Sequence, residues 1–386
     1  MNDSSSAGFD HAGIEEDREL QSSLTKKGAV MKSESAFTMG NTNHTLCSLI
    51  LILFLIIIAA APKSMAQTTI GPMPITPAPL PLTSNGPPID PQKGYLVQEL
   101  GDGLFFLTDG GYQCMFLTTG KGVILVDAPP DIGTNIIKAI REVTSEPVKY
   151  VVYSHSHADH IGSAGLFPNA TFIAQKEAAE LIVRDNDPNR PVPQIIFDRE
   201  FTLRLGHQVL QLKYFGPNHT HGNVFIYAPK QKVLMLVDVY FPGWSMVESF
   251  SFTGVTDLPG WVAAQDIALT YDFKYFVGGH LNRLGTREDM EVQREYVTDL
   301  RRNAVNALST ITLESIARVT GVQNSWFLFS SYLSALAQSC TDATLAKWKD
   351  RLGGADIFTW SHCNQIMQSL RANDGFAIDR PPVPVP

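Results

Sequence analysis

Short apolar stretches that stop at polar or glycine-rich turns recur through the middle of the chain. They lie at residues 123–126, 148–153, 224–227, 232–237 and 273–277. Apolar runs of four to eight residues bounded by turn residues are typical of buried β-strands. Asp127 and Asp238 directly follow two of these runs, and His280 follows the last one after two glycines. Because the ends of several strands can converge on one rim of a sheet, we expect a site at this rim.

The pattern changes after about residue 300, where apolar residues recur every three or four positions. One such series runs from Leu300 to Ile311 and another from Leu345 to Leu352, followed by Gly353 and Gly354. This spacing is typical of one face of an α-helix, and a glycine pair is typical of a break between helices. Residues 301–386 are therefore expected to form a helical C-terminal extension. We expect it to cap the preceding domain; covering the pocket or forming a homodimer surface are the alternatives.

The beginning of the chain has the composition of a targeting segment. Residues 1–45 are polar, residues 46–61 are almost entirely apolar, and Ser64-Met65-Ala66 follows. The apolar run at residues 46–61 is short for a membrane span, which needs about 20 residues, but its length suits the apolar region of a signal peptide. We therefore expect that residues 1–66 form an extension and signal peptide, with cleavage after Ala66 and export. The alternative is that this segment is not cleaved and anchors the protein in a membrane. No other contact with a membrane is expected.

A proline-rich stretch separates this beginning from the strands. Residues 67–93 contain prolines at short intervals, and such segments favour an extended, semi-rigid spacer. We expect a linker here, which assigns residues 94–300 to the domain that carries the strands.

Four metal-binding side chains occupy six consecutive positions after one of the strand-like stretches. The run Ser-His-Ser-His-Ala-Asp-His contains His155, His157, Asp159 and His160, although the chain has only ten histidines. Histidines two apart on extended backbone point to opposite faces, so two of them can share an ion only if the chain turns at Ser156. Imidazole and carboxylate groups suit zinc and, less selectively, iron, manganese or cobalt. A surface loop that binds metal adventitiously is the alternative.

Together with the later strand ends, this run resembles the signature of the metallo-β-lactamase superfamily: His-x-His-x-Asp-His, then a histidine, an aspartate and a final histidine. The resemblance covers roughly residues 94–300. It implies an α/β fold, a four-layer αβ/βα sandwich with the helical extension after it, and two zinc ions as cofactors. Carried over residue by residue, it assigns His155, His157 and His219 to the first metal, Asp159, His160 and His280 to the second, and Asp238 to both. Asp127 is implied to support the ligand loop without binding metal.

The third histidine of the signature has two candidates, His219 and His221, which flank Thr220. The family has histidine, threonine, a variable residue, glycine and asparagine at this point, and this order favours His219. His207 is expected to face solvent within the alternating run 201–212. The remaining histidines, His11, His44 and His362, are not expected to belong to the site.

The resemblance implies hydrolytic chemistry. Two cations about 3.5–4 Å apart hold a hydroxide between them and polarise the substrate oxygen. Asp159 is expected to be the catalytic residue that orients the nucleophile and passes a proton toward the leaving group. An oxygen donor at Asp238 is typical of the lactonase, glyoxalase II and phosphodiesterase branches, whereas several β-lactamases have cysteine there. We therefore expect a zinc-dependent lactonase-like or esterase-like enzyme whose metal-bridging hydroxide cleaves a cyclic ester or other acyl bond.

Three other functions remain open. They are β-lactam hydrolysis, sulfur oxidation by a single iron ion, and metal binding without catalysis. The lactone branch usually has a tyrosine three residues after the bridging aspartate, whereas Tyr240 lies two residues after Asp238.

The segment after Asp238 is rich in large apolar residues. We expect Tyr240, Phe241 and Trp244 to line a pocket for a small apolar acyl or cyclic-ester substrate; packing of the sheet is the alternative. The formal net charge of -8 argues against a nucleic-acid partner.

Cysteine usage is compatible with export. Cys114, Cys340 and Cys363 remain after the expected cleavage. In an oxidising compartment, Cys340 and Cys363 could bridge two helices of the extension, and Cys114 would be a buried free thiol.

Overall fold

The structure is a computed structural model that describes residues 76–250, 255 and 257–372. These residues belong to one compact unit, which spans Ile70–Pro386. The expected signal peptide and its cleavage position at Ala66 lie outside the described residues. Within the described part of the chain, no helix combines the length and the apolar character needed to cross a bilayer.

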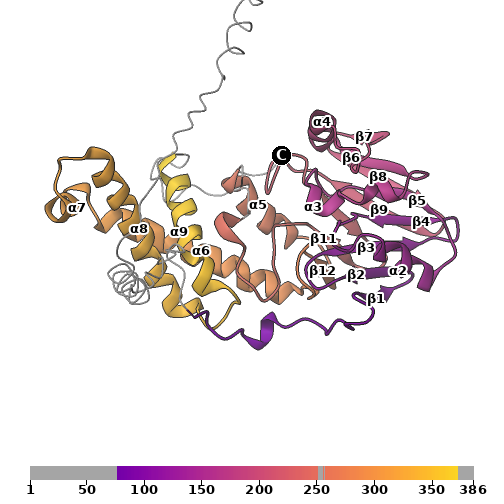
Figure 1. The fold of residues 1–386 in the computed structure, drawn as a ribbon, viewed down its shortest axis with the longest axis horizontal. Coiled ribbons are helices and arrows are strands. Elements are labelled where there is room, and N and C mark those ends of the chain that lie inside the picture. Colours follow the sequence, from indigo (N-terminus) through magenta and orange to yellow (C-terminus); the bar gives the residue numbers. More distant parts are fainter. Residues whose placement is uncertain (1–75, 251–254, 256, 373–386) are drawn as a thin grey trace, which may run out of the picture. The chain divides into compact units, whose positions relative to one another are not determined.

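Two β-sheets pack against each other through a shared core, on the right in the view of Figure 1. The first is antiparallel from β1 to β4 and parallel from β4 to β7. Its strands, in spatial order, are β1 (Leu96–Gly101), β2 (Leu104–Thr108), β3 (Gln113–Thr118), β4 (Val123–Val126), β5 (Val148–Val152), β6 (Thr171–Gln175) and β7 (Ile195–Phe197).

The second sheet has the order β12-β11-β10-β9-β8. Its neighbours are antiparallel except β11 and β12, which run parallel. The bounds are β8 (Glu200–Leu205), β9 (Gln208–Lys213), β10 (Phe225–Ala228), β11 (Val233–Met235) and β12 (Tyr275–Val277). The apolar stretches singled out in the sequence therefore form β4, β5, β10, β11 and β12.

Alternating side chains of the strands enter different cores and create four layers. In β4, Ile124 and Val126 lie in the core between the two sheets, while Val123 and Leu125 pack on the outer side of the first sheet. This alternation follows from the two-residue repeat of a strand, and burial on both faces explains its continuous apolar sequence. The outer layers are α2 (Asn135–Val143), α3 (Ala158–Ile161) and α4 (Lys176–Asp185) on the first sheet, and α5 (Leu258–Ala268) and α6 (Arg287–Thr310) on the second. The expected four-layer sandwich is confirmed.

Three C-terminal helices share the core on the outer side of the second sheet: α6, α8 (Ser325–Trp348) and α9 (Ala355–Ala372). The short helix α7 (Leu313–Thr320) lies between α6 and α8 in the chain and has no buried residue. Leu234 of the sheet, Leu300 of α6, Leu336 of α8 and Ile366 of α9 belong to one buried cluster. The boundary expected at residue 300 falls inside α6, because this helix carries apolar residues for both regions. The helical extension predicted from the spacing is confirmed, and it packs onto the sandwich.

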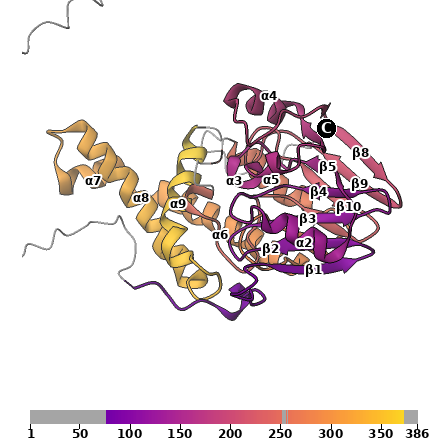
Figure 2. The ribbon, with the colours of Figure 1, turned by 45° about the vertical axis from the view of Figure 1, so that its right-hand side comes forward.

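A disulfide joins the last two long helices. Cys340 of α8 and Cys363 of α9 are bonded, with their Cα atoms 5.9 Å apart. These helices lie side by side in both views (Figures 1 and 2). Gly353 and Gly354 separate them as predicted, and Cys114 is a buried free thiol.

The described part of the expected linker packs against the rest of the unit. It contains the short helix η1 (Leu82–Ser84). The Ser84 hydroxyl donates to the Gly243 oxygen at 2.6 Å and accepts from the Gly353 amide at 3.1 Å. Asn282 donates to the Pro87 oxygen at 2.8 Å. Backbone groups of Gly243 and Gly353 and the side chain of Asn282 thus bind residues 76–93 to the rest of the unit.

Candidate metal centre

The histidine-rich run begins in the loop after β5 and ends in a single helical turn. His157 precedes α3, Asp159 lies in its first turn, and His160 lies in its last turn. The rings of His155 and His157 are 4.6 Å apart, centre to centre. The chain therefore turns at Ser156, as sharing of one ion by these histidines requires.

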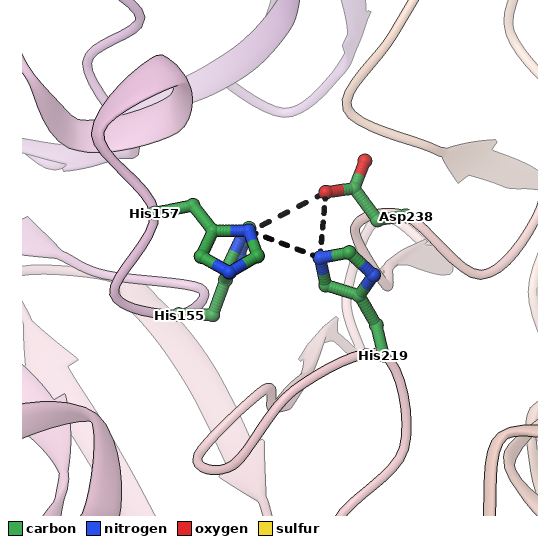
Figure 3. Close-up of side chains that lie close together, drawn as sticks. All are labelled: His155, His157, His219 and Asp238. Carbon is green, nitrogen blue, oxygen red and sulfur yellow. Dashed lines mark hydrogen bonds and ion pairs between the residues drawn. The ribbon is translucent and has the colours of Figure 1, made fainter. Parts of the chain in front are cut away.

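Four donors gather into a first group: His155, His157, His219 and Asp238 (Figure 3). His219 Nε2 lies 3.1 Å from His157 Nδ1 and 3.1 Å from Asp238 Oδ2. His155 Nε2 lies 3.7 Å from the same carboxylate oxygen. The donor atoms are all within 4.8 Å of one another, which is the spacing of ligands around one cation.

Asp159, His160 and His280 form a second group. His160 Nε2 and His280 Nε2 are 3.2 Å apart. Asp238 reaches this group as well, since its Oδ1 lies 3.0 Å from His280 Nε2 and its Oδ2 lies 3.2 Å from His160 Nε2. The seven residues predicted from the sequence are thus brought together, with Asp238 between the two groups.

The donor atoms themselves indicate that cations fit here. His155 Nε2 and Asp238 Oδ1 are buried and form no hydrogen bond among the described residues, although His280 Nε2 lies 3.0 Å from Asp238 Oδ1. Buried polar atoms without a partner are costly, and a bound ion would satisfy them. Nitrogen and oxygen donors without sulfur suit zinc, iron, manganese or cobalt. The arrangement is compatible with a dinuclear site.

The pKa values of the donors reflect burial and their mutual charges. Burial, followed by the nearby imidazoles, keeps the pKa of His155 well below its usual range and lowers that of His157 to about 4. Burial also opposes the charged form of His160, but the Asp238 and Asp159 carboxylates outweigh it and raise its pKa to about 9. Neutral imidazole is the form that binds metal, so His155 and His157 are ready ligands at neutral pH.

Asp127 holds the start of the histidine-rich loop through a hydrogen bond. Its Oδ1 accepts a hydrogen bond from the Ser154 amide at 2.8 Å, and burial raises its pKa to about 6. Ser154 in turn has its hydroxyl 2.9 Å from His155 Nδ1. Both Asp127 and Asp238 have a φ of 63°, an uncommon backbone conformation that is found at functional sites. Asp127 is not among the grouped donors, in line with the supporting position expected for it.

Two asparagines, which the sequence analysis missed, fix the His219 loop. Asn218 Oδ1 accepts from the His219 amide at 2.7 Å and from the Asn223 side chain at 2.8 Å. Asn223 also donates to the Val237 oxygen at 2.9 Å, next to Asp238. Their positions on either side of His219 are the signal that could have identified them.

A buried glutamine, also missed, holds the loop that carries His280. The Gln113 side chain donates to the His280 oxygen at 2.6 Å and accepts from the Gly278 amide at 3.0 Å. On the other side of the site, Arg190 donates to the Ser156 oxygen at 2.7 Å. Such outer contacts fix the direction of metal-binding side chains. Nothing in the local sequence marks these two residues.

Tyr112, beside Gln113, is a further residue at the site. Its hydroxyl lies 3.5 Å from Asp159 Oδ2, and its ring centre lies 4.7 Å from that of His280. Burial, followed by the negative charge of aspartates such as Asp159, raises the pKa of Tyr112 to about 12.

The three residues expected to line a pocket lie in different surroundings. Phe241 stacks on His280, with ring centres 5.7 Å apart. Tyr240 is buried in the outer core of the second sheet, where its hydroxyl donates to the Gln265 oxygen. The Trp244 indole donates to the Ser84 oxygen. The polar atoms of Tyr240 and Trp244 therefore form hydrogen bonds away from the metal-binding groups. These two side chains connect segments of the fold and do not line the metal centre.

The other described histidines lie apart from the grouped donors. His221 is exposed and pairs with Glu177 at 2.7 Å. His207 is exposed as expected, but in the turn between β8 and β9 and not in a strand. His362 is buried among the C-terminal helices, whereas His11 and His44 lie outside the described residues.

The chain is similar in sequence to known proteins over the region that contains most of these donors. A family model described as "Metallo-beta-lactamase superfamily" matches residues 107–252. The chain is 28% identical over 190 residues to the 2,4-dinitroanisole O-demethylase subunit alpha of Nocardioides sp. (strain JS1661), which covers 47% of this chain and 56% of that protein. It is 27% identical over 174 residues to the metallo-beta-lactamase type 2 of Elizabethkingia meningoseptica, covering 44% and 68%. The match thus spans between about half and two thirds of these relatives.

Among solved structures, the metallo-beta-lactamase from Pontibacter korlensis aligns with a TM-score of 0.45 at 20% identity, covering 52% of this chain and 97% of that one. The family match contains Asp127 and the ligand positions up to Asp238, and the structure adds His280 to the same cluster. With its four-layer sandwich and its histidine and aspartate metal-binding groups, the chain belongs to the metallo-β-lactamase superfamily.

Proposed function

We propose that this protein is an exported metal-dependent hydrolase that cleaves a cyclic ester or another acyl bond. The observation that carries the proposal is the position of Asp238. One of its oxygens lies 3.1 Å from His219 of the first group, and the other lies 3.0 Å from His280 of the second. A carboxylate shared in this way suits two neighbouring cations and one reaction centre.

Two bound divalent cations would supply hydroxide at neutral pH and polarise the oxygen of the scissile bond. Asp159 has the exposure that a proton-transferring group needs, since 41% of its side chain is accessible, against 7% for Asp238. Its Oδ2 lies 3.4 Å from His160 Nε2, at the edge of the cluster. Asp159 can therefore orient the nucleophile and carry a proton to the leaving group.

The acyl substrate class is supported by the groups around the site. An oxygen donor stands at Asp238, and the rings of Phe241 and Tyr112 flank His280. Aromatic walls favour an apolar substrate, and the formal net charge of -8 disfavours polyanions.

The names of two relatives suggest substrates in which a different bond is cleaved. The Elizabethkingia meningoseptica relative is a metallo-beta-lactamase, which keeps β-lactam hydrolysis as the second candidate. The Nocardioides relative is named as an O-demethylase subunit acting on 2,4-dinitroanisole, which adds an aryl methyl ether to the compounds worth testing. Export is supported by the bond between Cys340 and Cys363, since such bonds persist in oxidising compartments.

The test is an assay of the zinc-loaded full chain on lactones, aryl esters, thioesters, β-lactams, phosphodiesters and 2,4-dinitroanisole, with metal content measured in parallel. We expect about two zinc ions per chain and the highest kcat/KM on an acyl substrate, with activity lost to a chelator and restored by zinc. Asp238→Asn should lose both metal and activity, whereas Asp272→Asn, on the surface, should retain both. Activity on phosphodiesters alone, or one iron per chain with sulfur oxidation, would overturn the proposal.

A further inference from the structure

The backbone fixes Tyr112 beside His280. Asp109 Oδ1 accepts the amides of Gly111 and Tyr112 at 2.9 and 2.8 Å, which sets the turn before β3. Tyr112 then forms an antiparallel bridge with His280. The Gln113 amide donates to the Gly279 oxygen at 2.7 Å on the same side. The chain that carries the phenol is thus bound to the chain that carries a ligand.

The ring of Tyr112 is held by two of the grouped histidines. Its centre lies 4.7 Å from that of His280 and 5.6 Å from that of His160. These contacts limit the rotation of the ring and direct the hydroxyl toward Asp159 Oδ2, 3.5 Å away. A separation of 3.5 Å is long for a bond between a hydroxyl and a carboxylate, so this contact leaves the phenol O–H able to donate to a second acceptor.

Tyr112 lies on the accessible side of the metal centre. His155 and His160 have no exposed side-chain surface, whereas the side chains of Asp159 and His280 are 41% and 15% exposed. Tyr112 is itself only partly buried. A substrate reaching the cluster from solvent therefore arrives beside Asp159, His280 and the Tyr112 hydroxyl.

We propose that Tyr112 is a catalytic hydrogen-bond donor that binds the substrate oxygen on which negative charge develops during acyl cleavage. In the free enzyme the same O–H points to Asp159, which keeps the donor in place. The phenol forms and breaks no covalent bond and retains its proton; it supplies one preorganised donor in a partly desolvated site. This inference rests on the proposed function, because the oxygen that it binds belongs to an acyl substrate.

The experiment compares Tyr112→Phe with the wild type and with Tyr227→Phe. Tyr227 is a matched control, because its hydroxyl donates to the Asp272 oxygen at 2.7 Å on the surface. Each zinc-loaded full-length protein is measured for kcat and KM on the acyl substrate that the wild type cleaves best. Zinc content, thermal unfolding and the calorimetric affinity for a phosphonate analogue of that substrate complete the set.

Loss of one oxyanion donor typically reduces kcat about 10²–10³-fold. We expect Tyr112→Phe to lose at least about tenfold in kcat and a similar factor in phosphonate affinity, with unchanged zinc content and little change in KM. Tyr227→Phe should match the wild type in all of these. Equal kcat and phosphonate affinity in Tyr112→Phe and wild type would overturn the inference alone, as would a loss that follows lost zinc. A wild type without acyl activity would overturn the proposed function and this inference together.

Discussion

The side-chain amide of Asn223 donates to the backbone oxygen of Val237 at 2.9 Å. This bond joins the loop of His219 to the residue that precedes Asp238. The same amide donates to Asn218 Oδ1, which also accepts from the His219 amide. One buried side chain therefore fixes the positions of two donors of the first group relative to each other.

Replacing Asn223 with serine should weaken metal binding. The shorter side chain leaves the Val237 oxygen without its partner and frees His219 to move relative to Asp238. Loss of such an outer contact typically costs about 10–100-fold in metal affinity. Zinc titration against a competing chelator measures the change. Asn306→Ser, on an exposed position of α6, is the control and should bind zinc as the wild type does; an equal affinity of Asn223→Ser would show that Asn223 has no such role.

Asp159→Asn should lose turnover while the ion of the first group stays bound. General acid–base catalysis contributes about 10²–10⁴-fold to the rate, so kcat should fall by about 10²-fold or more. The first group should keep its ion. The first group does not include Asp159, which is why its occupancy should persist. Single-turnover kinetics and metal analysis of the same samples give both quantities. Retention of the wild-type rate would assign the proton transfer to another residue.

The donors could be predicted because their order in the chain resembles the family signature, and that signature is local in sequence. Its parts lie in the loops that follow β5, β9, β11 and β12, and the apolar strands before them are recognisable from their composition. The order of layers follows in the same way from burial on both faces of strands such as β4.

The remaining parts of the site depend on contacts between distant segments. Gln113 binds the oxygen of His280 across a separation of 167 residues, and no local pattern encodes that pairing. Periodicity also does not tell which way an aromatic residue in an irregular segment points. Tyr240 was expected at the pocket but enters the core, because the Gln265 oxygen offers its hydroxyl a buried partner.

Removal of the disulfide should destabilise the helical extension. The bond between Cys340 and Cys363 closes a sequence separation of 23 residues between α8 and α9. Replacing both cysteines with alanine is expected to reduce the free energy of unfolding by roughly 3 kcal/mol. Guanidinium unfolding without reductant measures the loss. Reductant should bring the wild type close to the variant and leave the variant unchanged; no response of the wild type would contradict the pairing.

His362 should make the stability of the protein depend on pH. Its ring is buried, with Nδ1 2.9 Å from the Tyr296 hydroxyl, Nε2 2.8 Å from the Val247 oxygen, and Phe250 stacked on it at 4.5 Å. Burial lowers the pKa of His362 from 6.5 to about 4. As the pH falls, His362 is therefore protonated near pH 6.5 in the unfolded chain, but only near pH 4 in the folded chain. The stabilisation is complete above pH 6.5 and is lost as the pH falls toward 4, by up to roughly 3 kcal/mol.

The measurement is the free energy of unfolding of zinc-loaded wild type and His362→Gln between pH 7.5 and 4. Other histidines also titrate in this range, so the informative quantity is the difference between the two curves at each pH. The wild-type curve should fall more steeply below pH 6.5, because glutamine takes up no proton in either state. His207→Gln changes an exposed imidazole and is the control for the exchange of a histidine for glutamine. Parallel curves for His362→Gln and wild type would show that His362 is not buried in its neutral form.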